Sequence, residues 1–156
     1  MPNNLYGPND NFNLETSHVI PALLKKMHEA KINNNEIVQI WGSGTPLREF
    51  LYVKDLAEAV VFCLLNVNSK FLNSLGVSHL NVGSGFEVSI AALVSLIKRT
   101  VGYKGNIIYD TTKLDGVPRK FLDSTLIKKL GWKPKTDLKS GLKKLYSWYK
   151  KNNIQN

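Results

Sequence analysis

A glycine-rich turn followed by a single arginine is the segment of this chain best suited to bind a phosphorylated ligand. Residues 41–57 read WGSGTPLREFLYVKDLA. Gly42 and Gly44 carry no Cβ, so their backbone can approach a ligand closely. Arg48 offers a planar guanidinium whose paired N–H donors suit a diphosphate. The alternative is an ordinary loop, an edge strand and a surface arginine, and the rest of the chain favours ligand binding.

His18 is the side chain best placed for proton transfer. It lies just before the apolar periodicity of the first predicted helix, where the positive end of the helix dipole favours a neutral imidazole. A neutral imidazole can exchange protons with a substrate near physiological pH. Position alone favours a capping or surface histidine over this role. His28 and His79 have no recognisable partner in the sequence, and we interpret both as structural.

Two other turns could contact a phosphorylated sugar. Residues 115–120 read DGVPRK, a rigid turn with charges of both signs that could clamp a sugar or phosphate, or simply be exposed. Residues 83–85 read GSG and stand between a predicted strand and a predicted helix, as a phosphate loop would. The third glycine of a dinucleotide fingerprint is missing, so we expect a tight turn and no complete cofactor-binding loop.

Length and composition indicate a single globular domain. The chain has 156 residues, of which 43% are hydrophobic. Cys63 is the one cysteine, which excludes a disulfide framework and a thiolate zinc site, and we expect it in the core. No metal site is expected. The N-terminus is polar, and no apolar run reaches membrane-spanning length. We therefore expect a soluble, cytoplasmic protein that does not bind membranes.

The formal net charge of +9 admits two interpretations. A basic surface could attract a nucleic acid or a nucleotide. Alternatively, the lysines solvate the surface. The basic residues cluster between Lys128 and Lys151, and most are lysine rather than arginine. Lysine is the weaker sign of specific phosphate recognition. We therefore favour a solvated surface and do not expect a nucleic acid partner.

The hydrophobic pattern predicts helices alternating with strands, which is typical of an α/β protein. The expected helices are 17–30, one from Asp55, one from Ser89 to Gly102, a short one after Asp123, and 138–152; the expected strands are 37–41, 49–53, 79–83 and 106–109. In the first helix, Ile20, Leu23, Leu24 and Met27 should form the buried face. In the second helix, the corresponding residues are Leu56, Ala59, Val60, Cys63 and Leu64, with Asp55 and Glu58 as a capping box.

Residues 4–12, 17–24 and 41–57 together resemble the GDP-L-fucose synthase family of extended short-chain dehydrogenases/reductases, in the NAD-dependent epimerase/dehydratase superfamily. The resemblance covers essentially the whole chain. It implies the C-terminal portion of an extended Rossmann-like fold. It also implies an NADP-dependent enzyme that epimerises GDP-4-keto-6-deoxy-D-mannose at C3 and C5 and reduces C4 to give GDP-L-fucose.

The resemblance also implies roles for individual residues. By matching motif position, His18 is the catalytic histidine that moves protons at C3 and C5. The positions near the nicotinamide end of NADP are Pro2, Asn3, Asn4, Leu5 and His18. The substrate-binding positions are Lys26, Trp41, Arg48, Asn106, Asp115 and Lys120.

Several parts of the family's active site have no match here. The glycine-rich cofactor loop, the Tyr-x-x-x-Lys pair and the cysteine that partners the histidine precede the matched region in the family. We therefore expect residues 1–156 to be a partial domain, the C-terminal substrate-binding half without the N-terminal cofactor-binding half, and inactive alone. A GDP-sugar ligand and a homodimeric full-length enzyme are expected. The alternatives are another nucleotide-sugar epimerase/dehydratase, or a non-catalytic basic nucleotide-binding module.

Overall fold

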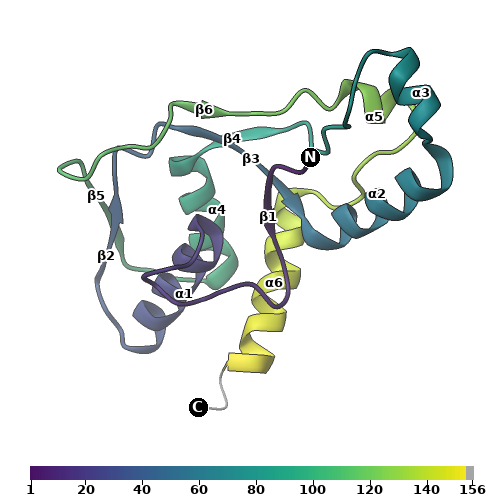
Figure 1. Cartoon of the computed structure of the whole chain (residues 1–156). Helices are drawn as coiled ribbons and strands as arrows, with labels where there is room; N and C mark the ends of the chain where they lie inside the picture. Colours follow the sequence, from purple (N-terminus) through teal and green to yellow (C-terminus); the bar gives the residue numbers. More distant parts are fainter. Residues whose placement is uncertain (154–156) are drawn as a thin grey trace.

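A computed structural model describes residues 1–153, which form six helices and six short strands (Figure 1). The helices are α1 Val19–Ile32, α2 Val53–Asn66, α3 Ser69–Ser74, α4 Ile90–Val101, α5 Thr125–Lys129 and α6 Leu138–Asn153. The strands are β1 Asn4–Tyr6, β2 Ile37–Trp41, β3 Leu47–Tyr52, β4 Glu87–Ser89, β5 Asn106–Asp110 and β6 Arg119–Lys120. The α/β prediction is confirmed.

Strand β3 lies at the centre of the larger sheet. Its second half pairs with β1 in parallel, so that Asn4 is opposite Phe50. Its first half pairs with β4 in antiparallel and with β6 in parallel, and the β6 register places Arg48 opposite Lys120. Strands β2 and β5 form a separate parallel pair. Strand β3 therefore connects the N-terminal segment to residues more than a hundred positions later in the chain.

The main hydrophobic core lies between α1, α4 and α6 and the strands. The predicted inner face of α1 is confirmed, because Ile20, Leu23, Leu24 and Met27 are all buried. Helix α4 begins and ends as predicted. The Ser89 hydroxyl accepts a hydrogen bond from the Ala92 amide at 3.1 Å, and Gly102 ends the helix in the left-handed conformation with φ 73°.

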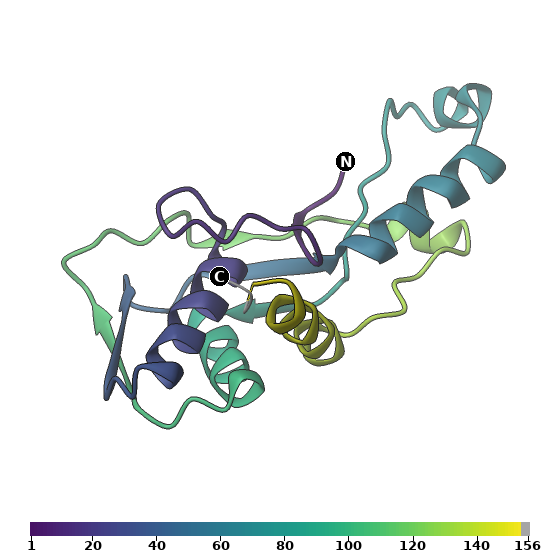
Figure 2. The same ribbon diagram turned by 90° about the horizontal axis from the view of Figure 1, so that it is seen from below.

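The prediction for α2 is wrong in its buried face. Leu64 is 78% exposed and Val60 is 51% exposed, although Ala59 is buried as expected. Figure 2 shows the reason, because α2 and α3 project away from α1, α4 and α6. Within residues 1–153, the partly buried apolar side chains Leu56, Phe62 and Cys63 of α2 pack on a second, smaller cluster. The buried members of that cluster are Leu51, Ala59, Val82, Ile127 and Trp132.

The predicted capping box of α2 is also wrong. The helix begins at Val53, and Tyr52 occupies the N-cap position without a side-chain cap. Asp55 lies inside the first turn, where its carboxylate is buried and accepts hydrogen bonds from the Thr136 amide at 2.9 Å and hydroxyl at 3.1 Å. The Asp55 carboxylate therefore binds a residue distant in sequence instead of capping its own helix.

Other boundaries differ modestly from the prediction. The expected strand 79–83 is reduced to one bridge, between Pro2 and Val82. The structure adds β1, β4, β6 and α3, which are too short to produce a periodic pattern. Helix α5 begins after Ser124, although the Asp123 carboxylate still accepts a hydrogen bond from the Thr125 amide. Within residues 1–153, none of the helices combines the length and apolarity needed to cross a membrane.

Candidate functional site

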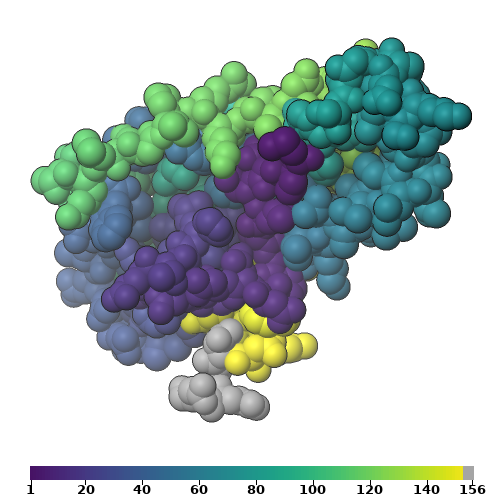
Figure 3. Space-filling model, viewed as in Figure 1, coloured from purple at the N-terminus to yellow at the C-terminus, as the bar shows by residue number. Residues whose placement is uncertain are grey.

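A cavity of about 630 Å³ lies where the N-terminal segment, the start of α1 and strand β3 meet. Figure 3 shows the N-terminal segment (purple) and the segment around β6 (green) exposed on the same face of the molecule. The wall of this cavity includes residues 2–5, His18, Arg48 and Lys120, which the family resemblance assigns to cofactor or substrate. We call this space the large cavity; its volume is within the range of small-molecule sites.

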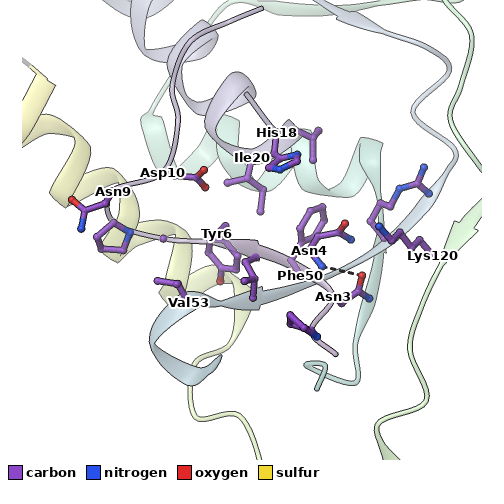
Figure 4. Close-up of a pocket in the computed structure, with 16 residues that line it drawn as sticks. Asn3, Asn4, Tyr6, Asn9, Asp10, His18, Ile20, Phe50, Val53 and Lys120 are labelled. Atoms are coloured by element: carbon purple, nitrogen blue, oxygen red, sulfur yellow. Dashed lines mark hydrogen bonds between the residues drawn. The ribbon is translucent and has the colours of Figure 1, made fainter. Parts of the chain in front are cut away.

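The pairing of β1 with β3 sets the position of the N-terminal segment. The Asn4 side-chain amide donates to the Glu49 carbonyl at 2.8 Å, and the Asn4 backbone amide donates to the Asn3 side chain at 2.9 Å. The second bond is drawn in Figure 4. These contacts hold residues 2–5, which the family resemblance assigns to a nicotinamide contact, along the wall of the large cavity.

His18 occupies the N-cap position of α1. Its backbone is extended, with φ −72° and ψ 168°, and its carbonyl accepts the Ala22 amide at 3.0 Å. The imidazole makes no capping hydrogen bond and is exposed at the cavity wall (Figure 4). The side chain is therefore not used to complete the helix and is accessible to a ligand.

A second cavity of about 370 Å³ contains four of the six predicted substrate contacts, and we call it the small cavity. Lys26, Trp41, Arg48 and Asp115 line it. Trp41 is 66% exposed, and two ammonium groups flank its ring, Lys26 at 5.4 Å and Lys113 at 5.8 Å from the centroid. Lys113 lies in the loop after β5, where no sequence pattern distinguishes it from other surface lysines.

Asp115 holds the glycine-rich turn in place. Its carboxylate accepts hydrogen bonds from the Ser43 amide at 2.9 Å and the Ser43 hydroxyl at 2.6 Å. Gly42 and Gly44 have φ of 81° and 79°, and a Cβ on Gly42 would overlap the Asp115 carboxylate. The turn therefore needs glycine at Gly42. The bonds from Ser43 to Asp115 fix the turn that follows Trp41.

Arg48 lines both cavities. One guanidinium nitrogen, Nη1, donates to the Leu47 carbonyl at 2.8 Å, which orients the fork. Lys120 lies opposite Arg48 in the β3–β6 register. Within the described residues 1–153, Arg48 forms no ion pair. The point where the cavities meet is therefore cationic.

Asn106 is the predicted substrate residue that the structure does not bring to either cavity. It begins β5 opposite Ile37 and is exposed. It lines a separate surface hollow with Glu36 and Lys104.

The side chains interpreted as structural, His28, His79 and Cys63, line neither cavity. His28 is buried, its Nδ1 lies 3.1 Å from the Tyr146 hydroxyl, and burial lowers its pKa. Cys63 packs against the second cluster, and burial raises the pKa of its thiol, which makes it a poor nucleophile. His79 is exposed beside Ser78. No cluster of three metal-ligating side chains occurs within residues 1–153.

Two acidic residues near the large cavity were not assigned a role from the sequence. Asp10 lines the cavity beside the N-terminal segment (Figure 4). Glu49 is buried behind the wall of the large cavity and accepts a hydrogen bond from the Gly85 amide at 2.6 Å. The position of Asp10 within a family-like segment could have pointed to it. The Gly85 bond supports a tight turn at 83–85, because that amide is already paired within the protein.

Comparisons with known proteins show the family of the chain. Residues 1–83 match the NAD dependent epimerase/dehydratase family. The chain is 53% identical over 152 residues to GDP-L-fucose synthase 1 of Arabidopsis thaliana, covering 97% of this chain and 45% of that protein. It is 46% identical over 154 residues to the GDP-L-fucose synthase of Escherichia coli (strain K12), covering 97% and 48%.

A solved structure shares the fold. A GDP-L-fucose synthetase from Naegleria fowleri, bound to NADP, superposes with a TM-score of 0.88 at 30% identity, covering 99% of this chain and 46% of that one. The chain thus spans about half the length of the curated relatives and the solved structure that it matches.

Proposed function

Because the chain belongs to the NAD dependent epimerase/dehydratase family, we propose that it forms the GDP-sugar-binding part of a GDP-L-fucose synthase. The full reaction is the NADP-dependent epimerisation of GDP-4-keto-6-deoxy-D-mannose at C3 and C5, followed by reduction at C4. In this proposal the chain contributes the nucleotide-sugar pocket and the imidazole that moves protons.

The position of Arg48 between the two cavities is the observation that carries the proposal. A nucleoside diphosphate sugar has its charge in the middle, with a planar base on one side and a polar ring on the other. The small cavity offers the aromatic face of Trp41 and the ammonium group of Lys26. The large cavity offers polar side chains and His18. The guanidinium between them suits the diphosphate.

His18 acts as an acid/base group in this proposal. The C4 ketone of the substrate acidifies the C–H bonds at C3 and C5, so a positioned imidazole can remove or return a proton there. The exposed ring on the wall of the large cavity supports this role, because a sugar bound in that cavity would lie beside it. Its carbonyl, not its side chain, closes the first turn of α1, so the ring can reorient between the two carbons.

NADP fits this chain in part. Residues 2–5 line the large cavity next to His18 and could contact a nicotinamide ring. Bound NADPH supplies the hydride for C4. The turn at 83–85 is unsuited to the cofactor phosphates, because the Gly85 amide is paired with Glu49. We propose that residues outside 1–156 hold the remainder of the cofactor.

The remaining expectations belong to the same proposal. A GDP-sugar is the small-molecule ligand, the full-length enzyme is a homodimer, and the reaction takes place in the cytoplasm. The surface lysines then serve solvation rather than nucleic acid binding. Sedimentation of the full-length enzyme would test the dimer.

Calorimetric titration of the 156-residue chain with GDP, together with an NADPH oxidation assay, tests the proposal. We expect saturable GDP binding and no NADPH consumption with GDP-4-keto-6-deoxy-D-mannose. Salt-sensitive RNA binding without any response to GDP would contradict the proposal and favour a basic binding module. NADPH consumption by the chain alone would contradict the expected lack of reductase activity. Product analysis of a full-length enzyme separates this activity from that of another epimerase or dehydratase.

A further inference from the structure

Glu49 is a buried carboxylate to which the proposed reaction gives no role. Its side chain is 0% exposed in the middle of β3, next to Arg48. Within residues 1–153 it forms no ion pair. A buried, unpaired carboxylate is costly unless several donors surround it. The fold must therefore supply hydrogen-bond donors around the Glu49 carboxylate.

Donors from three separate segments surround the Glu49 carboxylate. The Asn3 side-chain amide donates to Oε2 at 2.6 Å and the Gly85 backbone amide donates to Oε1 at 2.6 Å. The Leu122 backbone amide donates to Oε2 at 3.2 Å. The Ser84 hydroxyl lies 3.5 Å from Oε1 and 3.2 Å from the Phe86 carbonyl, so its one hydrogen is shared between these acceptors. A carboxylate has about four lone-pair sites, and the three amides occupy most of them.

The turn at 83–85 is shaped around this carboxylate. A Cβ added to Gly83 would overlap the Glu49 carboxyl group. Glycine is therefore required at this position because of close approach. The same two residues that looked like part of a phosphate loop, Gly83 and Gly85, instead accommodate and bind an internal anion.

Two of the three segments that Glu49 joins also line the large cavity. Asn3 belongs to the N-terminal segment, and Leu122 follows β6, which contains Lys120. Successive side chains of a strand point to opposite faces. Arg48 therefore faces the cavities, whereas Glu49 faces the interior behind the same wall.

We propose that Glu49 is a positioning residue for the nucleotide-sugar site. Its carboxylate fixes the N-terminal segment and the segment after β6 against β3, and so sets the spacing of Asn4, Arg48 and Lys120 around the large cavity. The identity of the ligand in this proposal rests on the proposed function. The positioning itself does not, because it concerns contacts within the chain.

Amide hydrogen exchange of Glu49→Gln, measured by NMR on the 156-residue chain, tests the positioning. The variant keeps the shape of the side chain, but its NH₂ group cannot accept from the donors that face it. We expect the Gly85 and Leu122 amides to exchange at least about tenfold faster, whereas the Ile97 amide in α4 stays within about twofold. Glu58→Gln is the matched control, because Glu58 is a half-exposed carboxylate on α2 that pairs with Lys135.

Three results would overturn the positioning role. One is unchanged protection of Gly85 and Leu122 in Glu49→Gln. Another is a uniform increase at Ile97 as well, which would indicate loss of global stability. The third is failure of both Glu49→Gln and Glu49→Asp to fold, which would show that Glu49 acts on the whole fold. Glu49→Asp keeps the charge on a shorter side chain and is the variant to measure if Glu49→Gln does not fold.

Titration of the same variants with GDP and with GDP-mannose tests the consequence for binding. The small cavity has no direct contact with Glu49, so we expect the Kd of GDP to change by less than about threefold in Glu49→Gln. The Kd of GDP-mannose should rise about tenfold, because its sugar reaches the large cavity. Glu58→Gln should leave both values unchanged.

The outcomes separate the two proposals. If the wild-type chain binds neither probe, the proposed function fails, and hydrogen exchange alone decides the role of Glu49. If the wild-type chain binds GDP-mannose and Glu49→Gln binds it equally well, the positioning proposal fails while the proposed function stands.

Discussion

Replacement of Arg48 gives the sharpest prediction for nucleotide binding. Arg48→Lys keeps the charge but loses the fork, so one of two charge-assisted hydrogen bonds to a diphosphate is removed. A hydrogen bond to a charged group contributes about 1.5–3 kcal/mol. The guanidinium is already oriented by its 2.8 Å bond to the Leu47 carbonyl, so little ordering offsets this loss. We expect the Kd of GDP to rise about tenfold or more in Arg48→Lys, and further in Arg48→Ala.

Isothermal titration of the 156-residue chain with GDP measures this effect. Arg99→Lys is the matched control, because Arg99 lies in the last turn of α4, is exposed, and lines neither cavity. The control should bind GDP as the wild type does. Equal GDP affinity of Arg48→Lys, Arg99→Lys and the wild type would refute the assignment of Arg48 to the diphosphate.

Three other predictions concern packing, pH and the glycine-rich turn. Leu24→Ala should lower the free energy of unfolding in urea by about 2–5 kcal/mol, whereas Leu64→Ala should change it by less than about 0.5 kcal/mol, and similar losses would contradict the exposure of α2. Burial lowers the pKa of His28 below its ordinary 6.5, so the unfolded chain binds its proton first and stability should fall as the pH drops through that value. Urea titrations at pH 7.5 and pH 5.5, about one unit either side of the ordinary histidine pKa, measure this fall in the free energy of unfolding. We expect a smaller fall in His28→Gln than in the wild type, and an equal fall would argue against His28 as the cause. Asp115→Ala should raise the Kd of GDP about threefold or more by releasing the turn that carries Trp41, and unchanged affinity in the same titration would count against that role.

Local sequence patterns predicted the elements whose signals are local. The apolar face of α1, the serine cap and the glycine end of α4 depend on residues within a few positions of one another. The grouping of Lys26, Trp41 and Arg48 was also predicted, because family-like motifs carry it, and the small cavity contains all three.

Features that depend on tertiary contacts could not be predicted from the sequence. Asp55 looked like a helix cap, but its carboxylate accepts a hydrogen bond from Thr136, which lies 81 positions later. Glu49 looked like part of a strand motif, and its donors come from three distant segments. The exposed side of α2 has the amphipathic spacing of a buried face, and spacing alone does not reveal how much of the helix is covered.

In the proposed function, His18 moves protons at the sugar of a bound GDP-sugar. Incorporation of solvent deuterium at C3 and C5 of GDP-4-keto-6-deoxy-D-mannose, followed by NMR in a full-length enzyme that contains these residues, tests this role most directly. We expect His18→Asn to suppress exchange at both carbons far more than it weakens GDP binding. Unchanged deuterium incorporation in His18→Asn would contradict it.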